Sequence, residues 1–75
     1  MTLRYETKAG TVSEDDQIMV MIEKLREASE AAYQIGHINN AHNRTTRGEG
    51  FRRMGQKLEE MAKIALNFAT ASTVQ

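Results

Sequence analysis

Apolar side chains recur every three or four residues in two long stretches of this sequence, as they do along one face of an α-helix. In the second stretch, residues 51–68, polar and charged side chains occupy the remaining positions. The spacing predicts a helix over residues 49–71 and a frayed tail over residues 72–75. The stripe expected to face the rest of the protein consists of Phe51, Met54, Leu58, Met61, Ala65 and Phe68.

The first stretch begins after Ser13, whose hydroxyl can accept a hydrogen bond from the amide of Asp16. The acidic run from Glu14 to Asp16 suits the positive end of the helix dipole. Gly36 suits a left-handed cap, so we expect the first helix over residues 13–36. Its predicted stripe consists of Ile18, Met21, Ile22, Leu25, Ala28, Ala32 and Ile35.

Apolar residues outside these stripes indicate assembly. Met19 and Val20 need a second burial surface, supplied by the N-terminal arm or by another subunit. The second helix carries an additional stripe of small side chains that permits close approach of another helix. A chain of 75 residues without cysteine buries only about 60–65% of its unfolded surface, so association is the remaining common source of stability. The additional stripe consists of Gly55, Ala62, Leu66 and Ala69.

The fold class expected from these patterns is all-α. A single domain, residues 1–75, forms a two-helix hairpin that assembles into a helical-bundle oligomer. Residues 1–12 are expected to form a short arm whose extended run ends at Gly10 and which either frays, packs on the helices or pairs with another subunit. Residues 37–48 are rich in Asn, Thr, Gly and Arg and predict a long basic loop. Whether the helices fold back or swap with a neighbour stays open.

Charge is unevenly distributed although the net charge is zero. Residues 13–30 contain six acidic and two basic side chains, whereas residues 36–57 contain five basic side chains and one acidic. Such asymmetry suits either an anion site in the basic part or docking of one protomer on another. Zero net charge makes a nucleic-acid-binding regulator the third choice among the functions considered.

The start of the second helix combines the ingredients of a phosphate site. Helix-terminal amides, glycines that let a ligand approach the backbone and arginines that bind phosphate bidentately occur together there. In the competing interpretation, the glycines only allow turns in the loop, and the arginines form a solvated face that pairs with the acidic first helix. The candidate ligand-binding residues of this region are Asn43, Arg44, Thr46, Arg47, Gly48, Gly50, Arg52, Arg53 and Lys57.

Catalysis and metal binding find no support in the pattern of residues. No nucleophile stands at a telling spacing from a His–Asp pair, so an enzyme is not expected. His37 and His42 lie five positions apart and would diverge on a helix, so neither a metal nor a cofactor is expected. The lack of a leader-like or long apolar run predicts a cytoplasmic protein that does not enter a membrane.

The capped acidic start of the first helix, its Ile22-Glu23-Lys24 segment and the apolar end of the second helix carry a resemblance. Over residues 12–70 the chain resembles the small helical-hairpin proteins by which phages sequester cyclic nucleotide or cyclic ADP-ribose signals (anti-CBASS and anti-Thoeris sponges). The resemblance implies a phosphate-binding role for Lys24. The Arg-Thr pair of that family is replaced here by Gln56 and Lys57.

The function expected from these observations is non-catalytic. We expect a small homo-oligomer that sequesters a phosphate-bearing, nucleotide-type small molecule, and the resemblance implies a role in phage counter-defence. The alternative is a protein-interaction module or inhibitor that docks on a protein target through the surface around Met19 and Val20 and the charged loop.

Overall fold

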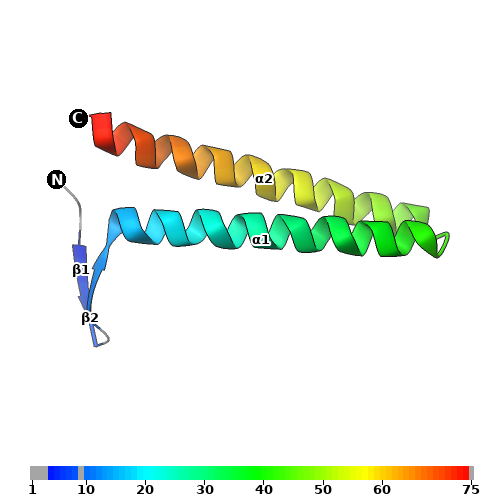
Figure 1. The fold of residues 1–75 in the computed structure, drawn as a ribbon, viewed down its shortest axis with the longest axis horizontal. Helices are drawn as coiled ribbons and strands as arrows, with labels where there is room; N and C mark the ends of the chain where they lie inside the picture. The colour runs from blue at the N-terminus through cyan, green and yellow to red at the C-terminus, as the bar shows by residue number, and fades with distance from the viewer. Residues whose placement is uncertain (1–3, 9, 75) are drawn as a thin grey trace.

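Two long antiparallel helices form the body of the computed structural model (Figure 1). The structure describes residues 4–8 and 10–74, except for the side chains of Tyr5 and residues 70–74. Helix α1 spans Glu14–Ala41 and helix α2 spans Thr45–Val74. Strands β1, Arg4–Thr7, and β2, Gly10–Ser13, precede them. The expected all-α hairpin is confirmed.

The N-terminal arm is a small antiparallel hairpin rather than one extended segment. Arg4 pairs with Ser13 and Thr7 with Gly10, and the Thr7 hydroxyl donates to the Gly10 carbonyl at 2.8 Å. Gly10 has φ 128°, a conformation that favours glycine, so it starts a returning strand where we expected the arm to end. Figure 1 shows this hairpin projecting from the start of α1, away from α2. Residues 1–3 and 9 of the predicted arm lie outside the described residues.

The start of α1 follows the prediction, because the Ser13 hydroxyl accepts from the Asp16 amide at 3.4 Å. The predicted long loop over residues 37–48 is wrong: three residues, 42–44, separate the helices. Asn43, at φ 60°, allows this short reversal, since asparagine tolerates the left-handed conformation better than most residues. The frayed tail is also corrected, because α2 extends to Val74; Gln75 lies outside the described residues.

The two helices approach closely along a seam of small residues. A Cβ placed on Gly36 would lie 3.1 Å from the Gly48 carbonyl oxygen, and one on Gly55 would lie 3.2 Å from the Ser29 carbonyl oxygen. The buried Ser29 hydroxyl donates to the Gly55 carbonyl at 2.8 Å. Gly36 is therefore an interhelical contact in the middle of α1, and the prediction that it caps the helix is wrong.

Seam positions alternate by four and three residues on α1 and by three and four on α2, the heptad spacing of helices packed at a shallow angle. Ile22, Ala62 and Ala65 form the buried apolar cluster, with Ile18 and Leu25 packed against it. The seam consists of Ile18, Ile22, Leu25, Ser29, Ala32, Gly36 and Asn39 on α1 and Gly48, Phe51, Gly55, Leu58, Ala62, Ala65 and Ala69 on α2.

Four of the seven predicted α1 residues and three of the six predicted α2 residues lie in this seam, and each of the others directly precedes a seam residue. Met54, Met61 and Phe68 were expected to be buried, yet 51%, 52% and 67% of their surfaces are exposed. Met21, Ala28 and Ile35 of the predicted α1 stripe are exposed as well. Small side chains occupy much of the seam because they let the two backbones approach closely, which larger side chains would prevent. The helix that approaches Gly55 and Ala62 is thus α1 of the same chain.

The hairpin is a single layer with more surface than a compact protein of its mass. Its extents are 51 × 30 × 11 Å, and the shortest is about one helix diameter. It exposes 6173 Å², whereas a compact 8.5 kDa monomer exposes about 4,700 Å². The radius of gyration, 16.5 Å, likewise exceeds the value of about 11 Å for a compact chain of this length.

Two glycines in α2 offer a matched test of the close approach. Gly48→Gln should lower the free energy of unfolding by about 2 kcal/mol, because a side chain there meets Asn40 and the Gly36 carbonyl, 3.0 Å from a Cβ. Gly50→Gln should raise it by about 0.5 kcal/mol through helix propensity, since no described atom lies within 4 Å of a Cβ there. Urea unfolding followed by circular dichroism at one protein concentration measures both. Equal effects of the two substitutions would contradict the close approach.

Candidate functional site

The turn between the helices is closed by a Schellman motif. The Arg44 amide donates to the Asn39 carbonyl at 2.8 Å and the Asn43 amide to the Asn40 carbonyl at 3.1 Å. The Asn39 side chain, buried in the seam, donates to the Ile35 carbonyl at 2.8 Å. These bonds satisfy the end of α1 and fix where α2 begins.

The glycines of the predicted phosphate site do not present a ligand-binding backbone. The Gly48 amide donates to the Arg44 carbonyl at 2.9 Å. A Cβ at Gly48 would point toward Gly36, so this side of the residue faces α1 and not a ligand. Gly50 lies farther inside the helix. The helix-terminal amides, which have no acceptor four residues earlier within α2, are instead those of Thr45, Thr46 and Arg47. Because α2 begins earlier than expected, the prediction for Gly48 and Gly50 is wrong.

The arginines of this region have partners on their own helix. Arg52 makes a two-pronged ion pair with Glu49, with Nε 3.0 Å from Oε2 and Nη2 against Oε1. Arg53 Nε lies 3.6 Å from Glu49 Oε1. The Arg47 guanidinium carbon lies 5.4 Å from the centre of the Phe51 ring, a cation–π distance. The interpretation of Arg52 and Arg53 as ion-paired surface residues therefore gains support, although Glu49 of α2, and not the acidic first helix, supplies the charge.

The remaining predicted residues are not brought to one place. Asn43, Arg44 and Thr46 lie at the turn and are exposed. Lys24 lies on α1, nineteen residues before Asn43 and therefore roughly 30 Å away along the helix, with Nζ 3.8 Å from Glu27. Lys57 lies more than two helical turns beyond Gly48.

Two shallow hollows flank the turn. One of about 230 Å³ is lined by Ile38, Asn39, His42 and Arg44. Another of about 450 Å³ is lined by Thr45, Thr46, Glu49, Gly50 and Arg53. Of the predicted cations, Arg44 thus borders the first hollow, while Arg53 borders the second beside the carboxylate that pairs with it.

Polar side chains gather on one side of the seam. Tyr33 of α1 is half-buried there near Glu59 and Arg52 of α2. Burial raises the pKa of the Tyr33 hydroxyl, and the charge of Glu59 and its hydrogen bond raise it further. A hollow of about 260 Å³ beside it is lined by Tyr33, Gly36, His37, Asn40 and Arg52. Tyr33 therefore stays protonated at neutral pH and serves as a hydrogen-bonding side chain.

Large apolar side chains occupy the other side. On α1, Met21 and Ile35 directly precede the seam residues Ile22 and Gly36, and on α2, Met54 and Met61 directly precede Gly55 and Ala62. One residue is a rotation of about 100°. An approximate two-fold axis perpendicular to the hairpin plane relates the antiparallel helices, so these steps lead to the same side.

We name this side the apolar face. It comprises two rows of exposed residues spaced by three and four, one row on each helix. Most of the large apolar side chains that the described part of the chain leaves exposed belong to it. The rows are Met21, Lys24, Ala28, Ala31, Ile35 and Ile38 of α1 and Met54, Lys57, Met61, Ile64 and Phe68 of α2.

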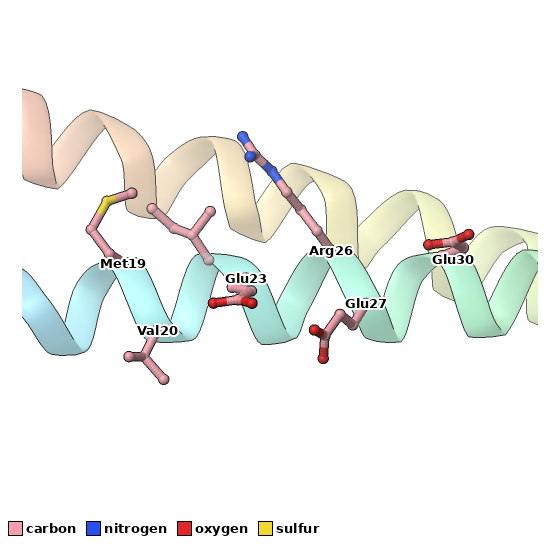
Figure 2. A pocket seen from close by; sticks show the side chains of 7 residues that line it. Met19, Val20, Glu23, Arg26, Glu27 and Glu30 are labelled. Carbon is pink, nitrogen blue, oxygen red and sulfur yellow. The ribbon is translucent and has the colours of Figure 1, made fainter.

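A further hollow of about 370 Å³ lies along the first half of α1, but its side chains do not converge. Figure 2 shows Met19 and Arg26 extending toward α2, whereas Val20 and Glu27 point away from it. Met19 and Val20 are 54% and 44% exposed, so the N-terminal hairpin does not provide the burial surface that we considered for them.

The described residues form neither a metal-binding cluster nor a membrane-spanning helix. Within residues 4–8 and 10–74, no group of three or more His, Asp or Glu side chains is placed to hold a metal ion. Neither helix, over the same residues, has an apolar stretch long enough to cross a membrane. The features that remain for function are the apolar face, the polar side and the turn.

Sequence reasoning missed the apolar face as a continuous surface. The signal was present, because each helix shows two overlapping three–four spacings one residue apart. Met21 and Ile35 were assigned to the same stripe as Ile22, which merged the two spacings into one broad stripe. Separating them required knowing that Gly36 and Gly48 lie in the seam.

The ion pairs around Glu49 generate a pH prediction. The hydrogen bond from Arg52 lowers the pKa of Glu49, the charges of Arg52 and Arg53 lower it further, and partial burial opposes them. The stabilisation is present at neutral pH and is lost as the pH falls through this lowered pKa. Arg52→Gln should raise the Glu49 pKa toward its ordinary value, and Arg53→Gln should raise it less; carboxyl-detected NMR titration measures both. An unchanged pKa in Arg52→Gln would contradict the pairing.

Comparisons with known proteins complete the description of the chain. Neither a protein-family model, nor a curated protein, nor a solved structure matches it. Function is therefore inferred from what the hairpin buries, what it leaves exposed and where its charges lie.

Proposed function

We propose that the protein is a non-catalytic interaction module that binds other protein chains through the apolar face of its helical hairpin. The observation that carries this proposal is the imbalance between buried and exposed apolar groups. Ile22 is the one large apolar side chain among the buried core residues of the described chain, whereas Met54, Met61, Ile64 and Phe68 are each more than half exposed. Monomeric proteins rarely leave a contiguous surface of this kind uncovered.

The spacing of the exposed residues suits a helical partner. Rows at three–four spacing present ridges that interdigitate with those of other helices, as in four-helix bundles. Methionine adapts to irregular apolar surfaces, and three of the face residues are methionines, Met21, Met54 and Met61. The proposal therefore adopts the protein-interaction alternative raised by the sequence, with the apolar face in place of the surface around Met19 and Val20.

A charged residue in the middle of the apolar face should abolish this binding. Met61→Glu introduces a carboxylate whose loss of hydration an interface would have to offset, while Met61, 52% exposed, contributes little to the seam of the hairpin. Tagged protein co-expressed with an untagged copy is recovered from cells, and the retained proteins are quantified by mass spectrometry. We expect at least about a tenfold loss of retained protein relative to wild type.

Glu30→Lys is the matched control, because Glu30 is exposed on α1 outside the apolar face. It should retain the same proteins as wild type, and circular dichroism should show equal helix content in all three proteins. Retention that is unaffected by Met61→Glu, or absent from wild type, would contradict the proposed function.

Sequestration of a phosphate-bearing small molecule is the second candidate. The supporting observation is that α2 begins at Thr45, so the amides of Thr45, Thr46 and Arg47 meet the exposed Arg44 at the turn. This location replaces the wider set that included Gly48, Gly50, Arg52 and Arg53. Lys24 lies too far along α1 to join the same ligand within one chain.

Native mass spectrometry before and after denaturation tests this candidate. A retained nucleotide-sized mass that denaturation releases would support it. Arg44→Ala should then reduce affinity for a nucleoside monophosphate at least about tenfold by removing the charge-assisted contact of the guanidinium. Lys24→Ala is the control and should leave affinity unchanged. Binding that is insensitive to Arg44→Ala would exclude the turn.

A further inference from the structure

We infer that the partner of the apolar face is a second copy of this chain, stacked face to face about a two-fold axis parallel to the helices. This inference rests on the proposed function and specifies its partner. In this arrangement α1 of one copy lies on α2 of the other, and four helices enclose one core. The evidence consists of the levels of the face residues, the charges beside them and the area left uncovered.

The internal contacts of the hairpin fix which residues lie at the same level along its length. Ser29 is level with Gly55, because its hydroxyl bonds to the Gly55 carbonyl. Gly36 is level with Gly48, whose carbonyl it contacts. Each step back along α1 therefore corresponds to one step forward along α2. An axis parallel to the helices preserves these levels between the two copies.

Charged residues bordering the face match at these levels. Glu27 lies two residues before Ser29, and Lys57 lies two residues after Gly55. Lys24 and Glu60 lie five residues before Ser29 and five after Gly55, respectively. Stacking α1 on α2 of the second copy thus places opposite charges together twice, and the two-fold axis repeats both pairs. All four residues are exposed in the hairpin.

Side-chain sizes are complementary along the same stack. Ala31 lies within one residue of the level of Met54, so a small side chain faces a large one. Ile35 lies within one residue of the level of Gly50, so here the large side chain belongs to α1 and the small residue to α2. Met21 and Ile64 form an apolar layer toward the other end. Alternation of large and small side chains is what allows facing helices to interdigitate.

The other face-to-face arrangement rotates one copy about an axis across the helices, so that α1 lies on α1. Setting Lys24 beside Glu27 of the second copy is possible there too. The same register then places Ile35 opposite Asp16, in the acidic first turn of α1, and Ile38 opposite the Ser13 cap. Ile35 would face a carboxylate there instead of Gly50, so the arrangement with α1 on α2 is favoured.

The uncovered area agrees with a dimer. The hairpin exposes 6173 Å², about 1,500 Å² more than a compact chain of its mass. A standard protein interface covers about 800 Å² on each partner, which this excess accommodates. Because the hairpin is one helix layer thick, a second layer also supplies the two-layer architecture on which soluble domains are built.

A charge exchange tests the arrangement. Glu27→Lys and Lys57→Glu, each alone, should raise the dissociation constant of the dimer about tenfold, because each places like charges together at two symmetric positions. The double variant Glu27→Lys/Lys57→Glu restores opposite charges and should return to within about threefold of the wild type. Sedimentation equilibrium of the full chain measures all four proteins, and Glu30→Lys is the control that should not weaken the dimer.

The outcomes separate this inference from the proposed function. With α1 on α1, the register that sets Lys24 beside Glu27 also sets Lys57 beside Glu60 of the second copy. The double variant would then carry like charges in both pairs and would be weaker than either single variant, which would overturn the arrangement. A wild-type chain that remains monomeric at all concentrations would overturn the self-association. If Met61→Glu still loses a different retained protein in either case, the proposed function stands.

Disulfide trapping gives an independent test, since the chain has no cysteine. A mixture of Ala31→Cys and Met54→Cys chains should form a cross-linked heterodimer on mild oxidation, because these positions meet only where α1 lies on α2. Each variant by itself should remain largely uncross-linked. Preferential cross-linking of Ala31→Cys to itself would overturn the arrangement.

Discussion

The close approach of α1 and α2 at Gly36–Gly48 and Ser29–Gly55 is the constraint on which the rest of the structure depends. Two backbones at this distance leave no room for large side chains between them. Alanine, glycine and serine therefore fill much of the seam, and burial of large apolar groups inside the hairpin is correspondingly small. The larger side chains are displaced to the neighbouring rows. A tight seam and an uncovered apolar face are thus two results of one packing choice.

Much of the fold could be predicted because it follows from local chemistry. The Ser13 cap and the long amphipathic patterns identify the two helices without any tertiary information. The turn could not be located from composition, because His, Asn and Thr residues typical of loops also occupy helix ends and first turns. From the sequence, Gly36 was expected to cap a helix and Gly48 to lie in a loop. Their role instead depends on a helix that approaches from elsewhere in the chain.

The candidate phosphate site shows the same limit for charged residues. The sequence brings five basic side chains close together along the chain, but their availability depends on partners one helical turn away. Glu49 pairs with Arg52 and lies near Arg53, and Phe51 lies beneath the Arg47 guanidinium. The single acidic residue of the basic segment therefore reduces the number of arginines that are available to a ligand. Only the early start of α2 leaves amides and Arg44 together at the turn.

The turn lies at one end of the hairpin, and both described chain ends lie at the other (Figure 1). A parallel assembly of two copies would therefore have two different ends. Under a two-fold axis parallel to the helices, both turns lie at the same end and both β-hairpins at the opposite end. Whatever binds one turn then meets a second, identical turn a short distance away. A target with two matching groups would gain avidity from the pair without any stronger individual contact. Pairing of the hairpins would thereby turn a single weak binding surface at the turn into a bivalent one.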